Sequence, residues 1–234
     1  MTRATPRRAF LRGLRDGAPF AVVVIPFAML FGLLAREAGW GMAEIMGMSA
    51  LVIAGAAQFT ALQMMAENAP LVLVIATSLA VNLRMAMYSA SLAPHLGPAP
   101  LWQRALIAYG LVDQTYGLAI NHYGRDPGAP IGHKVAYFAG AALAICTPWY
   151  GFTWLGAVAG QAIPEGLALD FAVPVTFIAI VAPALRSAPH LAAAVVAVAV
   201  ALALHGLPFS IGLLAGAAAG MAAGAAAELA GKRR

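Results

Sequence analysis

The chain has 234 residues, of which 62% are aliphatic, aromatic or cysteine and only 10% are charged. A soluble globular domain covers its core with roughly 25% charged residues, so this composition excludes an ordinary water-soluble globule. The apolar residues fall in long blocks, which indicates burial in lipid. The net charge of +5 does not indicate a nucleic-acid partner, because the basic residues gather at the two ends of the chain beside apolar segments, as in membrane proteins.

The N-terminal 17 residues form a basic segment that precedes the first apolar stretch, and residues 231–234 form a basic tail. This start imitates a secretory signal peptide, but Arg36 and Glu37 lie where a small-residue cleavage site would be needed. We therefore expect an uncleaved first helix. The interpretation is a basic cytoplasmic segment at 1–17, one transmembrane helical domain at 18–230 and a basic cytoplasmic tail.

Polar, proline and glycine residues divide the chain into eight apolar segments, most of them close to the 20 residues or so that cross a bilayer as a helix. The sequence predicts an all-α polytopic membrane protein with about eight transmembrane helices; the seventh segment is short, so seven is the alternative. Lys and Arg in the loops favour two cytoplasmic termini, although Arg104 would then face outward, against the scheme. The segments are 18–35, 45–65, 70–93, 102–121, 135–159, 167–185, 191–204 and 208–227.

Four prolines lie inside these segments. Each removes an amide donor and frees the carbonyl four residues earlier, and in lipid such a carbonyl must find another partner. We expect kinked or broken helices at Pro26, Pro148, Pro174 and Pro183.

Glycine recurs at every fourth position of the last segment, which makes one bare helix stripe for close packing. The sequence leaves open whether the neighbouring helix belongs to this chain or to a second subunit. No convincing internal repeat is visible. The stripe is Gly212, Gly216, Gly220 and Gly224.

Polar side chains inside apolar segments are the most informative residues. A charge near the bilayer centre costs about 2.5–3.5 kcal/mol on insertion scales, so it is kept where it pairs, lines water or acts. Arg84 and Asp113 are deep in the third and fourth segments and have opposite signs. We expect them to lie on a substrate or proton pathway; the alternative is an ion pair that only fixes helix register. The other candidates are Gln58, Asn82, Tyr88, Gln114 and Tyr116.

The sequence predicts no metal site, cofactor or enzymatic activity. The five histidines lie at segment ends or in loops, and none has a partner at metal-ligand spacing. Neither a nucleophile elbow nor a phosphate-binding loop is present. The lone Cys146 indicates a packing residue.

Several motifs, taken in order, resemble the AzlC/YgaZ family, the large subunits of branched-chain amino acid exporters. They are AGAAQF at 54–59, NLR at 82–84, YSASLAP at 88–94, DQTY at 113–116 and DFAVP at 170–174.

This resemblance implies secondary export of valine, leucine and isoleucine, extending to methionine, across the bacterial cytoplasmic membrane. It also implies a small AzlD-type membrane subunit as partner. With no nucleotide site in the sequence, we expect an ion gradient, that of protons, to drive export. Two other classes remain as alternatives, a non-transporting membrane scaffold and a passive channel for small solutes.

Overall fold

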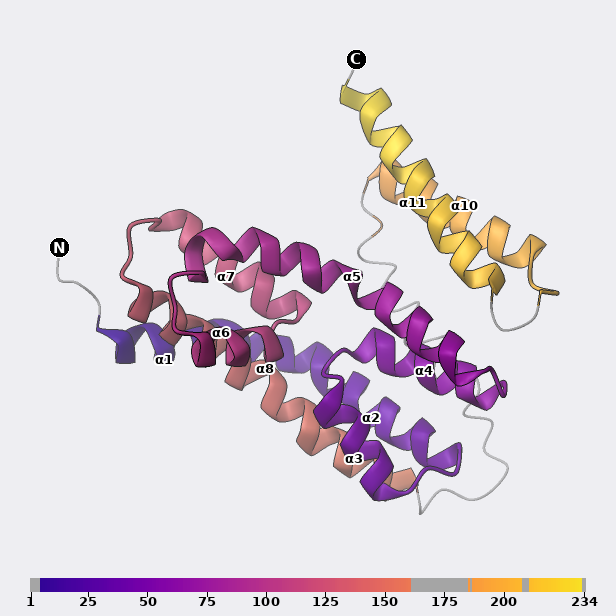
Figure 1. Cartoon of the computed structure of the whole chain (residues 1–234), viewed down its shortest axis with the longest axis horizontal. Helices are drawn as coiled ribbons and strands as arrows, with labels where there is room; N and C mark the ends of the chain where they lie inside the picture. The colour runs from indigo at the N-terminus through magenta and orange to yellow at the C-terminus, as the bar shows by residue number, and fades with distance from the viewer. Residues whose placement is uncertain (1–4, 161–184, 186, 208–210, 233–234) are drawn as a thin grey trace. The chain divides into compact units, whose positions relative to one another are not determined.

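The computed structural model describes residues 5–160, 185, 187–207 and 211–232, and their regular secondary structure is helical (Figure 1), which confirms the all-α prediction. The chain divides into two compact units, residues 1–62 with 78–167, and residues 63–77 with 168–234. The predicted span at 167–185 lies outside the described residues except for its last position, and Pro174 and Pro183 lie outside them as well.

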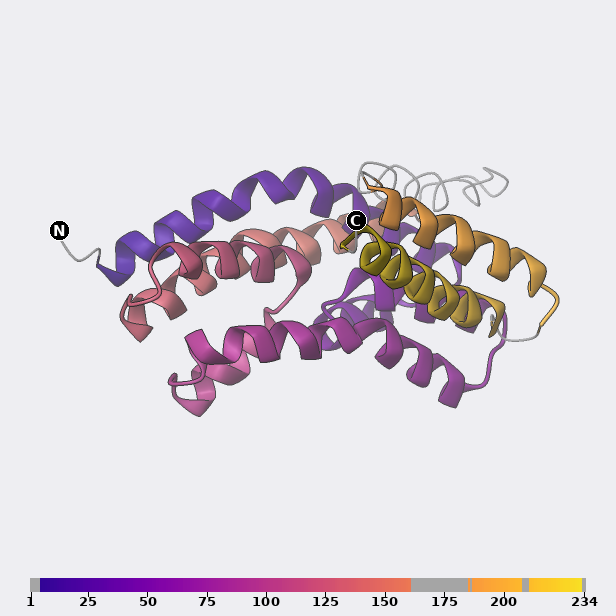
Figure 2. The same ribbon diagram turned by 90° about the horizontal axis from the view of Figure 1, so that it is seen from above.

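The first unit is built on a pair of long helical rods. One rod joins α1 (Pro6–Gly17), a 3₁₀ turn (η1, Ala18–Phe20) and α2 (Ala21–Glu37), and the other is α8 (Ile131–Gly160). Both are long and apolar enough to cross a membrane. They lie side by side in two perpendicular views, indigo beside salmon (Figures 1 and 2).

Glycine brings the two rods into backbone contact. At four glycines an added Cβ atom would overlap a carbonyl oxygen of the facing helix, so no larger residue fits without a shift. The contacts advance in the same direction along both helices, so the rods run parallel, as the first and fifth of the predicted spans should. The pairs are Gly13 with Tyr137, Gly140 with Phe10, Gly32 with Thr153, and Gly156 with Met29.

The second predicted span, 45–65, is two short helices. These are α3 (Met42–Leu51) and α4 (Gly55–Ala66), separated by a non-helical break at 52–54. α3 starts beside the end of α2, and Ile53 then packs level with the middle of α2. Phe59 of α4 makes edge contacts with two α2 rings, at 27 and 31. α3 therefore runs back along α2, and α4 turns again into the direction of α2 (Figure 1).

The third predicted span is α5 (Leu71–Leu96), and the fourth is again broken, into α6 (Leu101–Tyr109) and α7 (Asp113–Arg125) around a break at 110–112. Neighbouring side chains give the directions. Arg84, Tyr88 and His95 of α5 contact positions 113, 116 and 123 of α7. α5 and α7 are therefore parallel, and α6 runs between them in the opposite sense.

The prediction of single spanning helices over 45–65 and 102–121 is therefore wrong. Two apolar half-helices have the same summed length and hydropathy as one span, so these quantities do not reveal a reversal. Two of the four prolines, Pro26 and Pro148, do not break their helices. α2 continues across Pro26 and α8 across Pro148, because one lost hydrogen bond leaves the remaining helix and its packing in place. Both breaks instead fall at proline-free positions.

The first unit contains an inverted repeat that the sequence analysis missed. A long helix, a short antiparallel helix, a break and a short returning helix occur twice. The ends of α2 and α5, the starts of α3 and α6, and the starts of α4 and α7 lie 59, 59 and 58 residues apart. The two copies run in opposite directions, because Ala9 near the start of α1 packs in one cluster with Leu92 and Leu96 near the end of α5. Inverted repeats with broken helices are typical of secondary transporters.

In the second unit, α10 (Ala188–Ala203) and α11 (Ile211–Lys232) form an antiparallel hairpin. The glycine stripe of α11 faces α10 of the same chain. The stripe therefore gives no support for a second subunit. Its contacts are Gly212 with Leu204, Gly216 with Ala197 and Ala201, Gly220 with Ala193 and Ala197, and Gly224 with Ala193.

The broken fourth segment predicts a membrane topology that differs from eight spans. The loop at 97–100 and the loop at 126–130 should both face the side of the N-terminus, whereas eight spans place them on opposite sides. In a Cys146→Ala background, Pro98→Cys and Gly128→Cys should react with a membrane-impermeant maleimide from the same side, and Ala38→Cys from the other. Labelling of positions 98 and 128 from opposite sides would restore the single-span interpretation.

The glycine contacts predict a sharp difference between two neighbouring glycines of α8. Gly156→Leu should lower the thermal stability of the purified protein, because overpacking costs about 1–3 kcal/mol or more. Gly151→Leu is the matched control, since nothing lies within 4 Å of its added Cβ atom. Equal melting temperatures for the two variants would contradict the close contact between the rods.

Candidate functional site

An ion pair joins α5 and α7 where α7 begins. Arg84 Nη1 lies 3.2 Å from Asp113 Oδ2, and the side chains are 34% and 42% exposed. The Tyr88 hydroxyl donates to the other carboxylate oxygen, Oδ1, at 2.9 Å. Arg84 Nε is buried and has no hydrogen-bond partner among the described residues. Arg84 and Tyr88 together therefore bind both oxygens of Asp113, and one N–H donor of Arg84 stays unpaired among the described residues.

Asp113 owes its position to the break before α7. It lies in the first turn of that helix, where free N–H groups and the helix dipole favour a carboxylate. Fully buried Thr115 fixes this start. Its hydroxyl accepts from the Val112 N–H at 2.8 Å and donates to the carbonyls of Gly110, at 2.8 Å, and Val112, at 2.9 Å, which share its one proton.

Two tyrosines extend the site along the α5–α7 contact. The rings of Tyr88 and Tyr116 stack with centroids 4.2 Å apart and planes 10° apart. Tyr116 OH and Ser91 Oγ share a hydrogen bond of 3.1 Å. Ser91 is not among the residues singled out from the sequence; the sequence signal for it is its place three residues after Tyr88, on the same helix face.

Four of the seven candidate residues thus come together, and three do not. Gln58 is fully buried at the other break. Its Nε2 donates to the Val52 carbonyl at 2.5 Å, while its Oε1 has no partner among the described residues. Asn82 lies two residues from Arg84, on a different face of α5, and its buried Oδ1 is likewise unpartnered. Gln114 is half-buried beside Asp113.

The two breaks converge on one apolar cluster. Ile53 of the first break and Val112 of the second both pack against the buried side chains of Val24 and Ala28 in α2 and of Ile145 and Trp149 in α8.

A hydrogen-bond chain ties the ends of α3 and α6 together. The Tyr109 hydroxyl donates to the Ala50 carbonyl at 2.8 Å and lies 2.7 Å from the Tyr150 hydroxyl. The two copies of the inverted repeat are therefore joined near their breaks by a hydrogen bond as well as by apolar contacts.

Comparisons with known proteins identify a family of membrane proteins. The model of the family described as "AzlC protein" matches residues 19–163. An uncharacterized membrane protein of Archaeoglobus fulgidus is 32% identical over 213 residues, covering 89% of this chain and 90% of its own length. The inner membrane protein YgaZ of Escherichia coli is 27% identical over 229 residues, covering 92% and 91%. An uncharacterized membrane protein of Helicobacter pylori is 29% identical over 123 residues, covering 51% and 53%.

No solved structure matches the chain. The family model covers more than half of the sequence, and the archaeal relative aligns over nearly all of it. The chain is a membrane protein of the AzlC family.

Proposed function

We propose that this chain is the large subunit of a secondary exporter of branched-chain amino acids. The observation that carries the proposal is the half-buried pair Arg84–Asp113 at the start of a broken helix. A zwitterionic amino acid bears the same two charges. It can replace the internal pair with two new pairs, its carboxylate on Arg84 and its ammonium on Asp113, so that no charge is left alone. The exchange needs little reorganisation, because the protein already places the charges side by side.

The aliphatic tail of the substrate needs only an apolar wall. Leu111 and Val112 immediately precede Asp113, and Val112 belongs to the cluster formed by α2 and α8. Selectivity for valine, leucine and isoleucine would then arise from the size of the space beside the break, since one methylene in an apolar pocket is worth about 1–3 kcal/mol.

Proton coupling fits the same residues. When the substrate ammonium leaves, Asp113 either pairs with Arg84 again or takes up a proton. Tyr88, whose hydroxyl already donates to Asp113, is placed to pass that proton on. Export driven by a proton gradient then requires that loaded and protonated states of Asp113 alternate.

The charge distribution of the first unit supports a cytoplasmic N-terminus. The basic residues of α1 lie at the same end as Arg125 and Lys134, because the buried residues of α1, α5, α7 and α8 meet there. α6 starts at this end as well, so Arg104 joins the same basic group. The residue that opposed the orientation on the eight-span scheme therefore agrees with it on the broken one. Membership of the AzlC family supports a small AzlD-type membrane subunit as the partner of this chain.

The ion pair predicts a separation between folding and transport. Asp113→Asn and Arg84→Gln should each leave folded protein and lower valine efflux. Losing one charge-assisted hydrogen bond costs about 1.5–3 kcal/mol, roughly a 10–100-fold change in rate. The measurement is efflux of radiolabelled valine from cells that lack the native exporter, beside the melting temperature of the purified variant.

The double variant Arg84→Gln with Asp113→Asn discriminates between transport and a structural lock. If the pair carries substrate, the neutral double variant should fold and remain inactive. Near-normal efflux from it would show that the pair only fixes register, and unchanged efflux in cells lacking the chain would favour the scaffold.

Energy coupling and the partner can be tested together in liposomes. With an imposed proton gradient, the chain and its small partner should move valine uphill, whereas either subunit alone should not. Without the gradient, flux should stop at equal concentrations. Uphill export by the single chain would refute the need for a partner, and flux that never saturates with valine would indicate a channel.

A further inference from the structure

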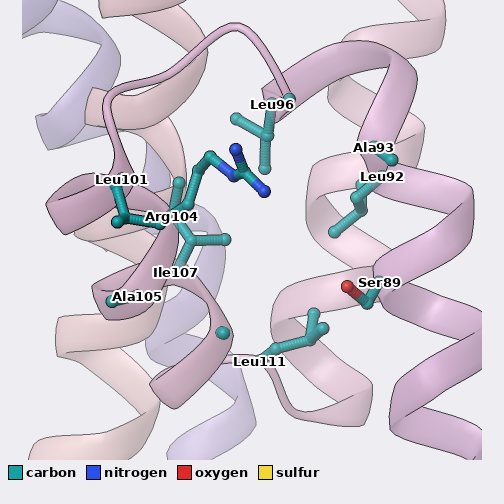
Figure 3. A pocket seen from close by; sticks show the side chains of 11 residues that line it. Ser89, Leu92, Ala93, Leu96, Leu101, Arg104, Ala105, Ile107 and Leu111 are labelled. Carbon is teal, nitrogen blue, oxygen red and sulfur yellow. The ribbon is translucent and has the colours of Figure 1, made fainter.

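A groove separates the last turns of α5 from α6 (Figure 3). Its volume is about 330 Å³, enough for a small amino acid. Leucine, isoleucine, alanine and glycine make up the lining, apart from Ser89 and Arg104. Arg104 lies at one end near Leu96, and Ser89 and Leu111 lie at the other.

The inner end of the groove is lined by two residues that are close in sequence to the ion-pair site. Ser89 follows Tyr88 in α5, and Leu111 precedes Asp113 by two residues. The outer end lies at the basic end of the first unit, because Leu96 belongs to the cluster that contains Ala9. The groove thus leads from that end of the unit toward the candidate site.

Arg104 is the charged group in the groove. Its side chain extends between Leu96 and Ile107 (Figure 3), and no ion pair of it exists among the described residues. A guanidinium binds a carboxylate with two parallel hydrogen bonds. A free guanidinium beside leucine side chains fits a ligand with a carboxylate at one end and a short aliphatic tail at the other.

The inverted repeat supplies an internal comparison. At the offset of 59 residues, Ile45 of α3 takes the place of Arg104 of α6. Ile45 is fully buried, and α3 packs against α8 and α2. Arg104 is exposed beside an open groove. The place of Ile45 is therefore filled by packing, whereas the equivalent place of Arg104 opens onto the groove. Such an asymmetry between the two copies is expected of a transporter of inverted repeats whose site opens to one side.

We propose that this groove is an access site that binds branched-chain amino acids on the N-terminal side before they reach Arg84 and Asp113. Arg104 holds the carboxylate, and Leu92, Leu96 and Ile107 surround the tail. The inference rests on the proposed function for its substrate class, and adds to it a second binding position. At this position the ligand is recognised by its carboxylate and tail alone, since no acidic side chain lines the groove.

Protection of a cysteine from alkylation tests the proposal directly. In the complex with its partner, with Cys146→Ala, Ala105→Cys should react with a small water-soluble maleimide. Leucine at about ten times its dissociation constant should slow the reaction roughly tenfold, by occupancy. Gly128→Cys, in an exposed loop at the same end of the unit, should react equally fast with and without leucine.

Ligand analogues separate the groove from the ion-pair site. 4-Methylpentanoate, which lacks the ammonium group, should protect position 105 but should not be exported. Isopentylamine, which lacks the carboxylate, should not protect. Arg104→Gln should raise the leucine concentration needed for protection by roughly 10–100-fold, the value of one charge-assisted hydrogen bond, whereas Arg125→Gln should leave it unchanged.

Each failure has a separate meaning. Unchanged protection in Arg104→Gln, or no protection while the wild-type complex exports leucine, overturns the access site alone. A cysteine at 105 that never reacts with the aqueous reagent assigns the groove to lipid and overturns it too. A wild-type complex that neither binds nor exports aliphatic amino acids refutes the proposed function together with the groove.

Discussion

A bilayer offers no water to backbone polar groups, so a helix can break inside it only where the protein supplies other partners. Two side chains meet this requirement in the first unit. Thr115 holds the carbonyls of Gly110 and Val112 at the second break, and Gln58 holds that of Val52 at the first. Because these bonds exist, the chain can reverse within an apolar segment. The half-helices and the interior start of α7 follow from that reversal.

Apolar side chains at the two breaks must also be buried, and the parallel rods of α2 and α8 bury them. Glycines at 32 and 156 let α2 and α8 approach to backbone contact, so the rods act as one surface. Ile53 and Val112 pack on that surface from the two copies of the repeat. Gly55 at the start of α4 meets the Trp149 ring so closely that an added Cβ atom would lie 2.7 Å from it. Close helix packing and helix breaking are therefore two parts of one arrangement.

The sequence alone predicts the helical class, the long first, third and fifth segments and the polar residues that meet. Spacings of four and three residues place Arg84 with Tyr88, and Asp113 with Tyr116, on shared helix faces. These spacings can be recognised in the sequence. The chain reversals at the two breaks cannot be predicted from hydropathy, because a pair of apolar half-helices has the same total hydropathy as one spanning helix. The repeat is not visible in the sequence because its two inverted copies share the order and spacing of their helices rather than their residues: Ile45 and Arg104 occupy equivalent places with opposite chemistry.

Under the proposed function, the two breaks would have different roles. At the first break the neutral amide of Gln58 binds α4 to the end of α3, with Met48 and Ser49 oxygens within 3.4 Å of its Nε2. A charged substrate cannot replace such a buried hydrogen bond between neutral groups by an equivalent interaction. At the second break the partners are charges, 34% and 42% exposed, and a zwitterion can replace each of them by an equal charge. The first break is therefore suited to a fixed joint, and the second, beside the α5–α6 groove, to the binding and release that transport requires.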